Sequence, residues 1–165
     1  VRRAFSQAHG LAGMRGGYAI SSDEVIDALR RVQRPFSVSR PAHDGALAAL
    51  GDEEHVRRTV EGTRAGRAML TSRLTQMGFT VLPSHANFVT LVLASDAAAT
   101  RLTTRLLERG CIIRPLAAFG LPSCVRISMG SEQELELALA SVAAVLREDP
   151  TLCRPRAGIT TGGDS

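Results

Sequence analysis

The chain has 165 residues, of which 44% are hydrophobic and 22% charged, a composition typical of a globular domain that buries a sizeable core. Its formal net charge of +4 arises from 20 arginines spread among 16 acidic residues. There is no basic block and few aromatic residues, so we do not expect it to bind nucleic acid. No lysine occurs, which excludes mechanisms that need a side-chain amine, such as a Schiff base.

The cysteines and the apolar runs indicate the cellular compartment of the protein. Cys111, Cys124 and Cys153 form no CxxC pair, so the sequence predicts neither a zinc site nor a disulfide framework and favours a reducing compartment. The apolar runs are too short to span a bilayer. A signal peptide is not expected either, because two polar residues directly follow Phe5. We therefore expect a cytoplasmic protein.

The first half of the chain is mostly helical in pattern. After a glycine-rich, irregular start, Ser21 and Glu24 have the spacing of a capping box and predict a helix that Pro35 ends. Further helices are predicted over 42–50 and 52–77. Two glycines in the middle of the longer helix predict a bend there. This half shows no sheet of its own.

From Phe79 onward, predicted strands alternate with predicted helices. The strands are expected over 79–81, 88–93, 111–114 and 125–128, and the helices over 96–109 and 131–148. Ser131 and Glu134 again have capping-box spacing. This order predicts an α/β fold in which helices cover one mixed or antiparallel sheet.

Taken one at a time, the polar motifs carry little functional information. The glycines near the start match no dinucleotide-binding fingerprint, and the four histidines lack metal-ligand spacing. Ser6 and Ser128 lack the context of a nucleophile elbow. Arg114 and Arg126 lie in short apolar strands, where a buried charge needs a partner. Either a surface ion pair or a bound anion would provide one.

Residues 3–18 read Arg-Ala-Phe-Ser-Gln-Ala-His-Gly-Leu-Ala-Gly-Met-Arg-Gly-Gly-Tyr. This segment resembles a motif of the class I/II pyridoxal-phosphate aminotransferases, most of all that of histidinol-phosphate aminotransferase. The family reads Arg-Thr-Phe-Ser-Lys-Ala-x-Gly-Leu-Ala-Gly-x-Arg-x-Gly-Tyr at this place. Four later segments resemble family motifs in the same order, namely 33–39, 84–89, 110–115 and 125–130. The resemblance covers about residues 2–148.

The resemblance implies a remnant of the aminotransferase large domain followed by the small domain of fold type I. Residues 1–40 would be the end of the large-domain cofactor motif and a linker, 41–78 long connecting helices and 79–148 the C-terminal α/β small domain. Residues 149–165 contain Pro, Gly, Thr and Arg without periodicity, which predicts a disordered tail. The family is usually homodimeric, so a second copy or an intact aminotransferase is an expected partner.

The resemblance also implies roles for single residues. Ser6 and Arg15 would bind pyridoxal phosphate, Arg15 through the phosphate group, and Asn87, Arg114 and Arg126 would lie at the substrate. The fork of donors on an arginine suits a phosphate or carboxylate. The implied substrate is a small amino acid or a phosphorylated amine, with no metal.

One position departs from the family in a way that affects the chemistry. Gln7 stands where the family has the lysine that holds the cofactor as a Schiff base, and no other lysine exists to replace it. Ala4 also replaces a threonine. We therefore predict no catalytic residue for transamination, no covalent cofactor bond and no transaminase activity of this chain alone.

Three interpretations remain open. The chain is the C-terminal part, or a degenerate relative, of an aminotransferase and begins at the lysine motif. Alternatively, it is a binding module that complements an aminotransferase partner or binds a phosphorylated metabolite. In the third interpretation it is a lysine-free enzyme of unknown reaction, with Ser6 and His9 as the available acid–base groups.

Overall fold

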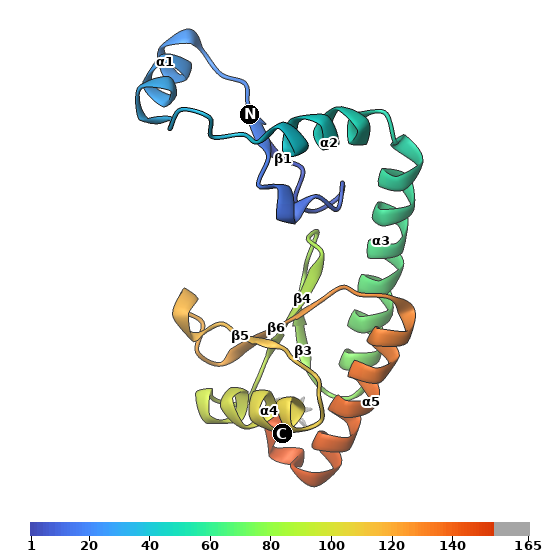
Figure 1. Ribbon diagram of the computed structural model, residues 1–165. Coiled ribbons are helices and arrows are strands. Elements are labelled where there is room, and N and C mark those ends of the chain that lie inside the picture. The colour runs from blue at the N-terminus through green and yellow to red at the C-terminus, as the bar shows by residue number, and fades with distance from the viewer. Residues whose placement is uncertain (154–165) are drawn as a thin grey trace, which may run out of the picture. The chain divides into compact units, whose positions relative to one another are not determined.

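The computed structural model describes residues 1–153, which form two compact units (Figure 1). The first unit is Val1–Glu61 and the second begins at Gly62. The boundary falls within helix α3 (Glu53–Gln76), inside the segment expected to hold the connecting helices. In the described residues, no helix is both long and apolar enough to cross a membrane.

The first unit contains a small sheet that the sequence does not predict. Strands β1 (Arg2–Ala4) and β2 (Gly17–Ala19) pair antiparallel, with Arg3 opposite Tyr18. A Cβ at Gly17 would lie 2.7 Å from the carbonyl oxygen of Arg3, so only glycine allows the two backbones to approach this closely. The expectation that this half has no sheet is therefore wrong. Strands of three residues are too short to show an alternating pattern.

The helices of the first unit begin at capping residues. Helix α2 (Arg40–Leu50) starts two residues earlier than expected, because the hydroxyl of Ser39 accepts a hydrogen bond from the Ala42 amide. Helix α1 (Asp23–Val32) corrects a prediction, since its N-cap is Ser22 and makes no side-chain capping bond. The Ser21–Glu24 spacing therefore gives the correct place for a helix start and the wrong cap.

The second unit contains one antiparallel sheet with the strand order β3-β4-β6-β5. Its strands are β3 (Thr80–Leu82), β4 (Phe88–Val92), β5 (Arg114–Pro115) and β6 (Cys124–Ser128). The expected strand over 111–114 is mostly outside the ladder. Gly110, at φ +74°, ends helix α4 (Asp96–Glu108), and the Cys111 amide still donates to the helix carbonyl of Leu106.

Helices pack on one face of this sheet and form the core with it. In Figure 1, α4 and α5 (Glu132–Glu148) lie on the same side of the strands. Buried core side chains come from the strands, from both helices and from the C-terminal part of α3, including Val89, Leu91, Val125, Leu102, Leu139, Leu70 and Leu74. The capping box at Ser131 and Glu134 is confirmed, with both of its hydrogen bonds present.

Helix α3 passes unbroken through both of its glycines. A Cβ at Gly66 would meet Leu135 Cδ1 of α5 at 2.8 Å, so this glycine permits close packing of two helices. Gly62 has nothing within 4 Å of such a Cβ.

The described chain continues for five residues beyond α5. Residues 150–152 form a short 3-10 helix, η3, and Leu152 is completely buried in the core of the second unit. The expectation of a disordered tail from residue 149 is therefore wrong for the first five residues of that segment. The other residues of the expected tail, 154–165, lie outside the described residues.

Candidate functional site

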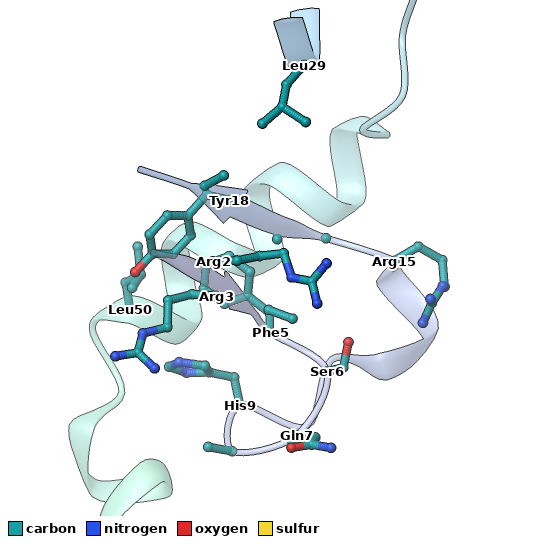
Figure 2. Close-up of a pocket in the computed structure, with 15 residues that line it drawn as sticks. Arg2, Arg3, Phe5, Ser6, Gln7, His9, Arg15, Tyr18, Leu29 and Leu50 are labelled. Carbon is teal, nitrogen blue, oxygen red and sulfur yellow. The ribbon is translucent and has the colours of Figure 1, made fainter. Parts of the chain in front are cut away.

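A hollow of about 1050 Å³ lies beside the β1–β2 pair of the first unit (Figure 2). The residues that bear on its chemistry are Arg2, Arg3, Ser6, Gln7, His9 and Arg15. No carboxylate of the described residues lines it. Three arginines without an acidic counterpart make the hollow suitable for an anion.

The turn that carries Ser6 and Gln7 is fixed by its backbone. Phe5 is buried, its amide donates to the Gly16 carbonyl at 3.2 Å, and its carbonyl accepts from the Leu11 amide at 2.9 Å. In Figure 2, the Ser6 hydroxyl is directed toward the strands, whereas the Gln7 amide lies at the opposite end of the turn. Ser6 is half-buried and Gln7 is exposed.

Arg15 has an unusual backbone conformation. It ends the short 3-10 turn η1 (Ala12–Met14) with φ +55° in the left-handed region. Its Nη1 donates to the Ala12 carbonyl at 2.9 Å, and within residues 1–153 it forms no ion pair. The remaining guanidinium donors are therefore available to an anion in the hollow.

His9 is the least satisfied polar group of this turn. Its ring packs against Phe5 with the ring centroids 5.2 Å apart, and its Nδ1 is buried without a hydrogen-bond partner in the described structure. His9 can be identified from the sequence, whereas Arg2 and Arg3 cannot. Those two arginines reach the hollow because they lie on strand β1, which is too short to be recognised from its pattern.

Two of the predicted arginines lie side by side on the second unit. The register of the sheet pairs Arg126 with Thr90 on one side and with Arg114 on the other. Residues directly opposite each other in a ladder point to the same face. That face is opposite to the one where Leu91 and Val125 enter the core.

Each of these arginines lies over a phenylalanine ring. The Arg126 Cζ is 5.0 Å from the centroid of Phe88, and the Arg114 Cζ is 5.1 Å from that of Phe119. Neither forms an ion pair within the described residues, and the Nε of Arg126 is buried there without a partner. A surface ion pair is therefore not what satisfies these charges in this part of the chain.

Asn87 lies just before β4 and outside the arginine row. Its carbonyl accepts a hydrogen bond from the Met129 amide at 2.8 Å, which fixes its backbone, and its side chain is exposed. The structure therefore brings Ser6, Gln7 and Arg15 to one hollow in the first unit. Separately, it brings Arg114 and Arg126 together in the second.

The fold agrees with one family of enzymes. Residues 1–142 match the family model described as aminotransferase class I and II, and the chain belongs to that family. Several individual relatives of the chain are histidinol-phosphate aminotransferases. The sequence is 40% identical to histidinol-phosphate aminotransferase 2 of Ralstonia nicotianae over 149 residues, which are 90% of this chain and 40% of that protein.

Other relatives and solved structures that the chain resembles are aminotransferases as well. Histidinol-phosphate aminotransferase of Nitratidesulfovibrio vulgaris is 44% identical over 88% of this chain and 39% of its own length. The structure resembles histidinol-phosphate aminotransferase of Sinorhizobium meliloti in complex with pyridoxal-5'-phosphate, with TM-score 0.83, 31% identity and coverage of 89% of this chain and 40% of that one. Aspartate aminotransferase of Thermotoga maritima gives TM-score 0.77 and 28% identity over 88% and 39%. The chain thus spans about two fifths of the length of these relatives.

Proposed function

We propose that this chain is a histidinol-phosphate-aminotransferase-like protein that carries anion-binding residues of the family and does not transaminate on its own. One observation carries the second part of the proposal. Gln7 occupies the position where the resembled motif has its lysine, and the sequence contains no lysine at all. An amide nitrogen is neither nucleophilic nor basic enough to form an imine or to move the substrate proton.

The residues present fit the phosphate of pyridoxal phosphate but not its aldehyde. Arg15 and Ser6 offer donors to a phosphate in a hollow that no carboxylate of the described residues lines. Gln7 cannot supply the covalent bond. When bound, this cofactor acts as an electron sink for bonds at the substrate α-carbon. In this chain, Ser6 and Arg15 would hold its phosphate without anchoring its aldehyde.

The second unit supplies the groups proposed for the substrate. Arg114 and Arg126 are paired across β5 and β6 and have no acidic partner among residues 1–153. Guanidinium groups suit a phosphate or a carboxylate, and two arginines at opposed ladder positions support a small amino acid or a phosphorylated amine as the ligand. Asn87 is proposed to lie near that ligand, with a weaker role.

The absorbance spectrum of the purified protein with pyridoxal phosphate tests the missing bond. We expect no band of lysine-bound cofactor, and no side chain modified after borohydride reduction and peptide mapping. Mapping is needed because the α-amino group of the chain also reacts with aldehydes. A side chain trapped in the wild-type protein, or measurable transamination by it, would contradict the proposal.

The variant Gln7→Lys gives the chain a single lysine, so side-chain trapping then reports on one position. We expect cofactor to be trapped at residue 7 in this variant and lost again when Arg15→Ala is added. Gln7→Arg is the matched control, because it adds a charge but cannot form an imine. Failure to trap cofactor in Gln7→Lys would contradict the proposed role of Ser6 and Arg15.

A second candidate function is complementation of an aminotransferase polypeptide. Helix α1 supports it, because none of its residues is buried and Val25, Leu29 and Val32 are exposed apolar residues. Size-exclusion chromatography with a polypeptide that carries the N-terminal three fifths of a histidinol-phosphate aminotransferase tests this candidate. Leu29→Glu should prevent a complex. Leu137→Glu, at a still more exposed position of α5, should not.

A further inference from the structure

Within residues 1–153, neither Arg114 nor Arg126 forms an ion pair with an acidic residue. Directly opposed like charges destabilise a β-ladder, and the pair Arg114–Arg126 is such a pair. Each arginine lies over an aromatic ring instead: the Arg114 Cζ is 5.1 Å from the ring centroid of Phe119, and the Arg126 Cζ is 5.0 Å from that of Phe88. The face of an aromatic ring attracts a guanidinium group.

Phe119 has no visible role in the core. Its side chain is 60% exposed, and it lies on the short 3-10 turn η2 (Ala117–Phe119). Phe88, in contrast, is half-buried within β4, so its replacement would also disturb packing. Phe119 is exposed and its ring lies under a guanidinium group. It is therefore the better candidate of the two for a residue that positions an arginine.

The turn that carries Phe119 is firmly closed. The Leu116 amide donates to the Cys124 carbonyl at 3.0 Å, and the Cys124 amide donates to the Leu121 carbonyl at 3.0 Å. Gly120 completes the turn at φ +77°, a conformation that glycine adopts without strain. These bonds fix the backbone that carries Phe119, and its ring lies beneath the guanidinium of Arg114 on β5.

We propose that Phe119 is a positioning residue that holds the Arg114 guanidinium against its ring, so that Arg114 and Arg126 together receive one phosphate-type anion. This inference rests on the proposed anion-binding role of the two arginines. The new element is Phe119, which orders Arg114, the more exposed of the two arginines. Burial of its Nε already restricts the side chain of Arg126. The side chain of Arg114 is exposed, so its position depends on the ring of Phe119.

Nuclear magnetic resonance of the arginine Nε–Hε groups tests the proposal, with inorganic phosphate as the titrant. In the full chain, we expect phosphate to shift the signals of both Arg114 and Arg126, which are assigned with Arg114→Gln and Arg126→Gln. Phe119→Leu removes the ring and keeps an apolar side chain. It should move the Arg114 signal in the free protein and weaken phosphate binding about two- to fivefold.

Two control variants separate the ring from the fold. Phe119→Trp should keep phosphate binding, because indole is the better platform for a cation. Leu121→Ala removes another exposed apolar side chain of the same turn and should change nothing. The inference is overturned if Phe119→Leu leaves the Arg114 signal and phosphate affinity unchanged, or if Phe119→Trp behaves like Phe119→Leu. No shift of either arginine in the wild-type protein would instead overturn the proposed anion role itself.

Discussion

At the scale of single residues, the two glycines inside α3 have opposite surroundings although they have the same helical conformation. A Cβ at Gly66 would meet Leu135 at 2.8 Å and Met129 Sδ at 3.4 Å, whereas one at Gly62 would meet nothing. Glycine costs a helix about 1 kcal/mol relative to alanine. Only at Gly66 does packing against α5 justify that cost.

The variants Gly62→Ala and Gly66→Ala should therefore change stability in opposite directions. We expect Gly62→Ala to raise the free energy of unfolding by about 1 kcal/mol. Gly66→Ala should lower it by about 1 kcal/mol, because overpacking costs about 1–3 kcal/mol and the helix gains part of that back. Urea titration followed by circular dichroism measures both, and an equal gain in the two variants would contradict the packing role.

Single residues also show where sequence reasoning stops. Gln7 could be identified from its place in a motif, because a motif is a local pattern. The row Thr90–Arg126–Arg114 could not, because it depends on strand register, and β5 contains only two residues. The stacking of Phe119 on Arg114 depends on the same register and on the turn η2.

At the scale of elements, the start of α5 follows from local chemistry, whereas strands β1, β2 and β5 do not. Helix α5 starts where Ser131 and Glu134 predict it, since a capping box involves residues three apart in sequence. The hairpin β1–β2 and strand β5 have two or three residues each, so no alternation can mark them. They form because neighbouring strands and turns provide their partners.

The capping box of α5 should make the second unit sensitive to acid. Hydrogen bonds from the backbone amide and the hydroxyl of Ser131 lower the pKa of Glu134 below its ordinary value of 4.5. A lowered pKa in the folded state stabilises the fold above the unfolded pKa, and this contribution disappears as the pH falls through the folded pKa.

We therefore expect Glu134→Gln to be less stable than the wild-type protein at neutral pH. The difference should vanish at a pH well below 4.5. Chemical denaturation over this pH range measures it. Ser131→Ala should cost about 1 kcal/mol at neutral pH, because it removes the N-cap acceptor. A difference between Glu134→Gln and wild type that does not depend on pH would contradict the capping role.

At the scale of the whole molecule, the core of the second unit uses residues from outside the expected small domain of 79–148. Leu70 and Leu74 before that range and Leu152 after it are all fully buried in the core. Helical periodicity reveals which face of α3 is apolar. It does not reveal that this face packs on a sheet formed later in the chain.

Limited proteolysis of the full chain should accordingly leave a fragment that begins near Gly62 and retains Leu152. Mass spectrometry of the resistant species identifies its ends. Leu152→Ala should lower the stability of that fragment by about 2–5 kcal/mol, the range for a fully buried leucine. A resistant fragment confined to 79–148 would show instead that the flanking leucines are dispensable.

The opposed arginines of β5 and β6 also link folding to the composition of the solution. Their mutual repulsion is present only in the folded ladder, so an anion that binds between them favours the native state by mass action. Chloride and phosphate at equal ionic strength screen the other surface charges similarly, but only phosphate offers several oxygens to two guanidinium groups. The melting temperature of this protein should therefore depend on which buffer anion is present, as well as on how much salt.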